Sequence, residues 1–196
     1  GHLSTGIVGT YFLYHALARN GRSDVAYKVI TAKGFPGFEY MFNFENQFVA
    51  PATTMWEDWE GRSSLCHPVQ GCVASYLYEQ LAGIRPIEKF PGYKQFRLEP
   101  HFARELKNVE CSLNTPQGEI SSSWERKKDH IRWKVSVPIN CTARLVIPSS
   151  IESCTTKSGE PLEDVGLLEG KSQKEAEGEK KFHLLGPGNY EFVINA

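Results

Sequence analysis

"HIRWKVSVP", His130 to Pro138, alternates apolar and polar residues and ends at a proline. A period of two is typical of a strand with one buried face. The pattern recurs between Pro, Gly and Asn turns in EISSSWERK (119–127), TARLVIPSS (142–150) and GNYEFVINA (188–196). The second half of the chain is therefore predicted to be an antiparallel β-sandwich. The Glu-, Lys- and Gly-rich run from 159 to 181 is interpreted as a solvated loop or protruding hairpin.

Before these strands, the apolar residues recur at helical spacing. One helix is predicted from Val8 to Leu17, ending at Asn20 and Gly21. A second helix is predicted to begin with Ser23 as its cap and to end at Gly34. A third is predicted over residues 67–83. Its expected buried stripe consists of Val69, Val73, Tyr76, Leu77 and Leu81.

The composition, net charge and cysteine pattern of the chain exclude several classes of protein. The chain has 196 residues, 40% of them hydrophobic and 12% aromatic, which is enough for a sizeable core. A net charge of −1 provides no field that would attract nucleic acid or an anionic membrane surface. Neither a membrane-spanning run nor a secretion signal is visible, and the compartment stays unknown. The five cysteines form no CxxC pair and have no histidine at zinc-site spacing, so we expect free thiols, mostly buried, and no metal site.

Three or four helices are too few to close a helical barrel, and the chain opens in mid-pattern without a start methionine. The sequence therefore predicts a fragment, with one apolar flank of the helical half left uncovered or covered by a partner. Between the second and third helices, residues 35–66 form a long aromatic segment predicted to be irregular. Loops of this length in compact domains are usually functional or disordered, and this one is too aromatic for disorder.

That segment contains TTMWEDWEG, Thr53 to Gly61, in which three carboxylates lie among two tryptophans. Either the acids solvate the exposed side of a buried strip, or rings and acids together line a cleft for a polar, ring-shaped ligand. A sugar fits the second reading, because its apolar faces lie on aromatic planes while its hydroxyls need directional hydrogen bonds. Glycosidic hydrolysis requires two carboxyl groups, and neighbours in sequence tend to point different ways. At most one or two of Glu57, Asp58 and Glu60 can face a common pocket.

Five blocks in one order resemble the C-terminal part of bacterial α-L-rhamnosidases of glycoside hydrolase family 78. They are HLSTGIVGTYFLYHALARNGRSDVAYKVI, GFEYMF, ATTMWEDWEG, SSLCHPVQGCVASYLYEQLAGIRP, and PGYKQFRLEPH with TPQGEISSSWER. The resemblance covers residues 1 to about 148. It implies an α+β chain in which residues 1–88 are the last helices of an (α/α)6 toroid and residues 89–196 are a C-terminal antiparallel β-sandwich.

The resemblance also implies an inverting mechanism in which Glu57 is the general base and the general acid lies on an upstream part of the barrel. Trp56 and Trp59 would form the walls of the sugar pocket, and Asp58 and Glu60 would face solvent or brace the loop. In the same family the residue matching His67 contacts substrate hydroxyls. The residue matching Tyr40 is an aromatic near the cleft. No cofactor or metal is required, because the carboxyl pair supplies both acid and base.

The leading hypothesis is thus that the chain is part of an α-L-rhamnosidase, which cleaves terminal α-linked rhamnose from glycans or glycosides. Without the upstream barrel, the chain is expected to be inactive. Its partners would be a rhamnose-containing oligosaccharide or glycoside and the remainder of the barrel, with no nucleic acid and no membrane. Cys66 and Pro68 replace a commoner Asn and an aromatic residue, which keeps a toroid glycosidase of different sugar specificity open. A non-catalytic carbohydrate-binding module is the alternative from another class.

Overall fold

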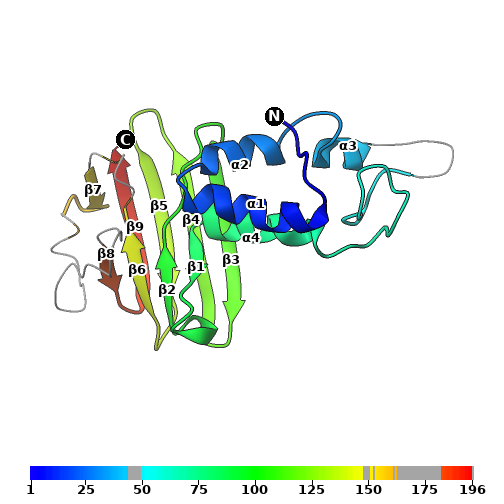
Figure 1. Ribbon diagram of the computed structural model, residues 1–196. Coiled ribbons are helices and arrows are strands. Elements are labelled where there is room, and N and C mark those ends of the chain that lie inside the picture. The colour runs from blue at the N-terminus through cyan, green and yellow to red at the C-terminus, as the bar shows by residue number, and fades with distance from the viewer. Residues whose placement is uncertain (44–49, 148–150, 152, 161, 163–181, 196) are drawn as a thin grey trace. The chain divides into compact units, whose positions relative to one another are not determined.

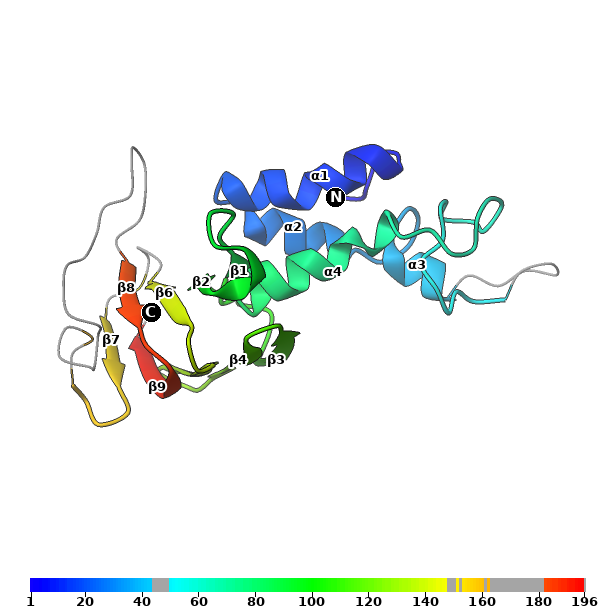
Figure 2. The ribbon, with the colours of Figure 1, turned by 90° about the horizontal axis from the view of Figure 1, so that it is seen from below.

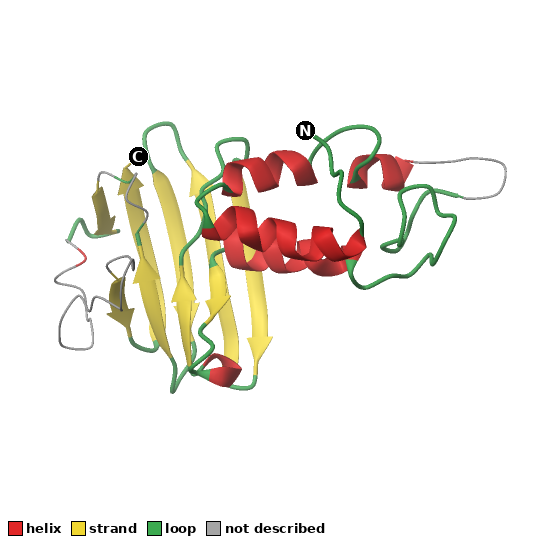
Figure 3. Cartoon of the chain, viewed as in Figure 1, coloured by secondary structure: helices red, strands yellow, loops and turns green. Residues whose placement is uncertain are grey.

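A computed structural model describes residues 1–43, 50–147, 151, 153–160, 162 and 182–195. The chain forms two compact units, Gly1–Leu77 and Tyr78–Ala196. The first is helical and the second consists mainly of strands (Figure 3). The predicted division between residues 88 and 89 stays a prediction. No helix among the described residues is long and apolar enough to cross a membrane.

In the first unit, helix α1 (Ile7–Arg19) packs against α2 (Ser23–Ile30) and α4 (Val73–Tyr76), as Figure 1 shows. The rings of Tyr14 and Tyr76 meet in the interior, with centroids 6.0 Å apart. Both side chains have no exposed surface, and burial raises the pKa of the Tyr14 phenol. Packing of buried apolar faces, more than intrinsic helix propensity, stabilises such short helices.

The ends of these helices differ partly from expectation. α1 ends at Arg19 with Asn20 as its C-cap, close to the predicted end. Ser23 is not the cap of α2 but its first residue; it is buried, and its carbonyl accepts the Tyr76 hydroxyl at 2.8 Å. α2 also ends at Ile30, before the predicted Gly34. The segment predicted to be irregular contains a short helix, α3 (Phe38–Asn43).

The third helix changes character along its length. It begins as a 3-10 turn, η1 (Gln70–Cys72), continues as α4, and ends as a π-helix, η2 (Leu77–Leu81). Leu77, predicted to be buried, is 43% exposed, whereas Gln80 is only 5% exposed. The buried row runs through Val73, Tyr76 and Gln80 at spacings of three and four, and Leu77 lies beside this row rather than in it.

The second unit is a sandwich of two sheets, seen from below in Figure 2. One sheet has the order β1-β2-β6-β8 and the other the order β3-β4-β5-β9-β7. The strands are β1 (Ile84–Pro86), β2 (Gln95–Leu98), β3 (Asn108–Thr115), β4 (Gly118–Arg126), β5 (Ile131–Val137), β6 (Thr142–Val146), β7 (Ser153–Thr156), β8 (Phe182–Leu185) and β9 (Gly188–Asn195). A 3-10 turn, η3 (Pro91–Tyr93), precedes β2.

All four predicted strands are present as β4, β5, β6 and β9. The pairing is antiparallel throughout except between β2 and β6, which run parallel. The entire β3–β5 part of the other sheet separates these two strands in sequence, which leaves ample chain for the crossover that a parallel pair needs. Most of the loop interpretation at 159–181 lies outside the described residues.

The core of the sandwich is built from alternate residues of strands in both sheets. On β5, Ile131, Trp133, Val135 and Val137 are all buried, as the period of two predicts. Trp124, Trp133 and Phe192 of the five-stranded sheet pack with Phe96 and Leu145 of the four-stranded sheet. The cysteines are free, as expected, but only Cys141 is fully buried.

Residues 79–83 connect the end of η2 to β1, the first strand of the sandwich. Their five backbone carbonyls are here called the capped helix end. The last carbonyls of any helix lack partners within the helix and must find donors elsewhere. Here donors from residues 85–124 supply one hydrogen bond to each carbonyl. These bonds are Arg85 Nε to Glu79 O (2.7 Å), His101 N to Gln80 O (2.6 Å), Trp124 Nε1 to Leu81 O (2.8 Å), Ser122 Oγ to Ala82 O (2.6 Å) and Glu99 N to Gly83 O (2.9 Å).

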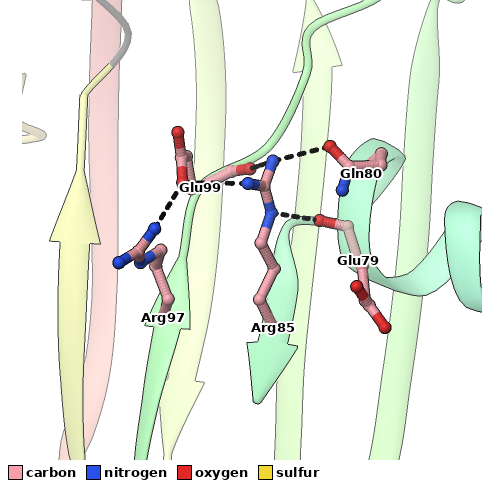
Figure 4. A network of polar contacts seen from close by, with 5 residues as sticks. All are labelled: Glu79, Gln80, Arg85, Arg97 and Glu99. Atoms are coloured by element: carbon pink, nitrogen blue, oxygen red, sulfur yellow. Dashed lines mark hydrogen bonds and ion pairs between the residues drawn. The ribbon is translucent and has the colours of Figure 1, made fainter. Parts of the chain in front are cut away.

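A charged network stabilises the same place (Figure 4). The Glu99 carboxylate is 4% exposed and receives the guanidinium groups of Arg85 at 3.0 Å and Arg97 at 3.6 Å. Arg85 also donates to the Gln80 side chain at 2.7 Å and to the Glu99 carbonyl at 3.1 Å. Burial lowers the pKa of Arg85, and the charge of Glu99 opposes that shift.

Ser122 bridges two parts of this arrangement and offers a direct test. Its hydroxyl donates to Ala82 O and accepts the Trp133 indole N–H at 3.0 Å, all without exposure. Ser122→Ala leaves both partners unsatisfied, and we expect the free energy of unfolding to fall by about 2 kcal/mol. Urea denaturation measures this loss of stability. Ser123→Ala, at a half-buried serine of the same strand, is the matched control. Equal loss in both variants would contradict the bridging role.

Candidate functional site

The segment from Thr54 to His67, here called the site loop, is closed by hydrogen bonds between its two arms. The Glu57 N–H donates to Ser64 O at 2.8 Å, and the His67 N–H donates to Met55 O at 2.6 Å. The Thr54 hydroxyl donates to the carbonyl of Leu65. The loop thus turns back on itself within a few residues, and its arms lie side by side.

Asp58 fills the inside of this turn. Its Oδ1 accepts the N–H groups of Glu60 (2.9 Å) and Arg62 (3.1 Å), and its Oδ2 accepts that of Ser63 (2.8 Å). Gly61 has φ +68°, a left-handed conformation that suits glycine in so tight a turn. Burial alone would raise the pKa of Asp58, but hydrogen bonding by the three N–H groups and by the Ser63 side chain outweighs it and lowers the pKa.

That lowered pKa has a defined sign for stability. Because the folded-state value is depressed, the stabilisation from Asp58 is present above the unfolded pKa of about 3.9 and is lost as the pH falls through the folded value. Asp58 is therefore ionised, and the turn is closed, throughout the neutral range.

Glu57 is half-buried at the start of the turn. Its Oε2 accepts the Ser64 N–H at 3.2 Å, so Glu57 and Ser64 contact each other through both backbone and side chain. Among the described residues Glu57 forms no ion pair, whereas Glu60 pairs with the Arg62 guanidinium. The three acids of the motif thus differ: Asp58 braces the turn, Glu60 pairs with arginine, and the second carboxylate oxygen of Glu57 has no hydrogen-bond partner among the described residues.

The two tryptophans of the motif lie in different surroundings. Trp56 is 3% exposed and is part of the core of the helical unit, so little of its ring is left for a ligand. Trp59 is half-buried and meets Phe38 of α3 edge-on, with ring centroids 5.4 Å apart. Phe38 in turn stacks on Phe42, which is 43% exposed. A role for Trp56 and Trp59 as walls of a sugar pocket stays a prediction.

His67 and Tyr40 lie on different segments, the site loop and α3. The His67 backbone belongs to the returning arm of the site loop, and its Nδ1 is buried without a hydrogen-bond partner in the part of the chain that the structure describes. Tyr40 lies on α3, where its ring meets Phe35 edge-on at 5.2 Å. Contact of either residue with substrate stays a prediction.

Two features of the site were not predicted from the sequence. Ser64 supplies the backbone N–H that contacts the Glu57 carboxylate, and nothing in the letters SSLC indicates this. Phe38 and Phe42 form the aromatic continuation of Trp59, and the aromatic density of GFEYMF could have indicated them. Within the described ranges, no three His, Cys, Asp or Glu side chains cluster closely enough to hold a metal ion.

Both units match known families. Residues 1–81 match the family model of the bacterial alpha-L-rhamnosidase 6 hairpin glycosidase domain, and residues 83–161 match that of the bacterial alpha-L-rhamnosidase C-terminal domain. The helical unit thus corresponds to the last helices of an (α/α)6 toroid, and the sandwich to the β domain that follows it. The chain belongs to the bacterial alpha-L-rhamnosidase family, as its sequence predicted.

Individual relatives agree with this assignment. Two alpha-L-rhamnosidases of Formosa agariphila are 30% and 34% identical over 100% and 97% of this chain. The solved alpha-L-rhamnosidase of Dictyoglumus thermophilum matches the whole chain with a TM-score of 0.76 and 29% identity. That of Streptomyces avermitilis, complexed with L-rhamnose, matches 99% of it with a TM-score of 0.75 and 26% identity. The chain spans only 20% and 21% of the length of the two Formosa relatives.

Proposed function

We propose that this chain provides the general base of an inverting α-L-rhamnosidase. In this reaction Glu57 removes a proton from water as that water attacks the anomeric carbon. A general acid on the opposite side of the sugar protonates the leaving oxygen. The carboxyl groups of inverting enzymes lie about 6.5–9.5 Å apart, which leaves room for the water. The acid would come from a part of the barrel outside these 196 residues, so the chain alone should be inactive.

The observation that carries this proposal is the state of the Glu57 carboxylate. One oxygen is fixed by the Ser64 N–H, while the carboxylate forms no ion pair among the described residues. A general base needs both properties: a fixed orientation, and a lone pair not already engaged by a cation. Relatives named as rhamnosidases, one of them complexed with L-rhamnose, support the choice of sugar.

The surroundings of Glu57 are compatible with a sugar ligand. Trp59, two residues further along the loop, offers a half-buried indole, and Trp56 fixes the loop from the interior. Nδ1 of His67 has no hydrogen-bond partner among the residues that the structure describes, and a sugar hydroxyl or a bridging water could satisfy it after a small movement. We propose that Trp59, His67 and Tyr40 contact the rhamnose, while Trp56 supports the loop from the interior.

The remainder of the barrel is proposed to cover the outer face of α1. Val8, Tyr11 and Phe12 lie three and four residues apart on that helix and are 67%, 47% and 61% exposed. An exposed apolar stripe of this kind usually marks a surface that packs against another element. Further helical hairpins of the same toroid are the natural occupants, because residues 1–81 match a six-hairpin domain.

The test is an assay of a polypeptide that contains the complete barrel with this chain at its C-terminus. We expect release of the aryl group from an aryl α-L-rhamnoside, with β-L-rhamnose as the first sugar product seen by NMR. Formation of α-L-rhamnose would contradict inversion, and absence of cleavage would remove the rhamnosidase assignment. Parallel assays with aryl α-L-arabinosides and α-D-mannosides address the alternative of a toroid glycosidase with another sugar preference.

A non-catalytic carbohydrate-binding module remains the second candidate, because the outer face of the five-stranded sheet is hollowed. One depression of about 420 Å³ is lined by polar and charged side chains that include Glu110, Ser123 and Lys134. That volume falls in the range of small-ligand sites, but such sites are mostly apolar. The polar lining therefore makes this candidate the weaker of the two.

Calorimetric titration of the 196-residue chain with L-rhamnose separates the two candidates. We expect no measurable binding at millimolar sugar, because an incomplete barrel supplies only part of the contacts. Clear saturable binding that a Lys134→Ala variant abolishes would favour the module. Binding abolished by Trp59→Ala instead would locate the sugar at the site loop.

A further inference from the structure

The site loop contains a second acid, Asp58, that is hydrogen-bonded to the returning arm next to the residue that contacts Glu57. Asp58 accepts three backbone N–H groups, from Glu60, Arg62 and Ser63. Ser63 directly precedes Ser64, whose N–H and carbonyl contact the Glu57 carboxylate and backbone. The Asp58 carboxylate therefore fixes the returning arm at Ser63. The next residue, Ser64, donates the N–H that orients the Glu57 carboxylate.

The charge of Asp58 matters for this role. Hydrogen bonds to an ionised acceptor are about twice as strong as those between neutral groups, and three of them converge on this side chain. Glu60 has a comparable carboxylate two residues away, but it pairs with the Arg62 guanidinium. The two acids thus form a matched pair in which only one braces the backbone.

We propose that Asp58 is a positioning residue, which holds the Ser64 N–H against the Glu57 carboxylate and so sets the orientation of the general base. The proposal rests on the proposed function of Glu57. It assigns Asp58 no contact with the sugar and no proton transfer. Its effect on the reaction passes entirely through the shape of the turn.

Amide hydrogen exchange in the 196-residue chain tests the structural half of the proposal. In Asp58→Ala, the exchange rates of the Glu60, Arg62, Ser63 and Ser64 amides should rise by about ten-fold or more, because the acceptor is gone. Asp58→Asn retains one acceptor oxygen and should give an intermediate increase. Glu60→Gln should leave the Ser63 and Ser64 amides within about two-fold of wild type, because no backbone amide of the described residues bonds to that carboxylate, which pairs with Arg62 instead. Unchanged exchange at Ser63 and Ser64 in Asp58→Ala would overturn the proposal.

Steady-state kinetics of the polypeptide with the complete barrel test whether Asp58 affects catalysis. Asp58→Ala should lower kcat for an aryl α-L-rhamnoside by about ten- to a hundred-fold while KM changes little, since only the alignment of the base is disturbed. Asp58→Asn should recover part of the loss, and Glu60→Gln should behave like wild type. A purely structural role would instead reduce the fraction of folded enzyme and leave kcat per active site unchanged.

The outcomes separate this proposal from the one on which it rests. Normal turnover in Asp58→Ala beside an inactive Glu57→Gln overturns the positioning role alone. Normal turnover in both variants, or no cleavage by wild type, overturns the proposed function of Glu57 and the role of Asp58 together. Faster exchange with reduced kcat and unchanged KM supports both.

Discussion

Glu57→Gln is expected to reduce kcat for an aryl α-L-rhamnoside by about 10²- to 10⁴-fold in a polypeptide with the complete barrel. The substitution removes the basic oxygen pair but retains an oxygen that can accept the Ser64 N–H, the hydrogen bond that orients the side chain. Unfolding should therefore change little, because Glu57 forms no ion pair among the described residues. Stopped assays of aryl release, with circular dichroism for folding, measure both quantities.

Glu60→Gln is the matched control for that loss. It removes the same charge three residues away, where the carboxylate pairs with Arg62 at the surface of the loop. Surface ion pairs contribute little, so this variant should retain nearly full activity. Normal turnover in Glu57→Gln, or an equal loss in Glu60→Gln, would remove Glu57 from the chemistry.

Gly83→Ala is expected to lower the free energy of unfolding by about 2–5 kcal/mol, the sum of the costs of a left-handed non-glycine residue and of an overpacked site. Gly83 has φ +80°, and a Cβ there would lie 2.3 Å from Pro100 N and 2.6 Å from Glu99 C. Both neighbours are backbone atoms and cannot turn aside as a flexible side chain could. Urea denaturation followed by circular dichroism measures the change.

Gly92 supplies the control for this substitution. It lies in the same unit with φ +73°, but a Cβ there meets no atom within 4 Å. Gly92→Ala should therefore lose only the conformational part, about 1–2 kcal/mol. If both alanine variants lose the same free energy of unfolding, the close approach of Gly83 to residues 99 and 100 does not contribute to the cost of the substitution.

The strands that could be predicted are those whose own residues alternate strongly. β5 alternates buried and less buried positions along its whole length, and its sequence shows the same period. β1 has only three residues and β8 only four, too few to establish a period. The parallel pairing of β2 with β6 depends on contacts between distant segments, and no local pattern reports those contacts.

The candidate site was predictable in composition but not in geometry. The motif around Glu57 was visible because tryptophans and acids rarely alternate so closely, and its family resemblance supplied the proposed roles. The burial of Trp56 and the three N–H groups on Asp58 were not visible, because both depend on how residues 54–67 fold back. The exposure of Leu77 was not predicted, because the buried row runs through Val73, Tyr76 and Gln80 and Leu77 lies beside it.

The capped helix end has a consequence for engineering. Five donors each match one carbonyl of residues 79–83: a guanidinium, an indole, a hydroxyl and two backbone amides. A sandwich from a relative could therefore not be grafted as an interchangeable cassette behind these residues unless it reproduced the same donors in the same register. Chimaeras should be joined upstream of Tyr78, so that the transplanted piece brings its own helix terminus with it.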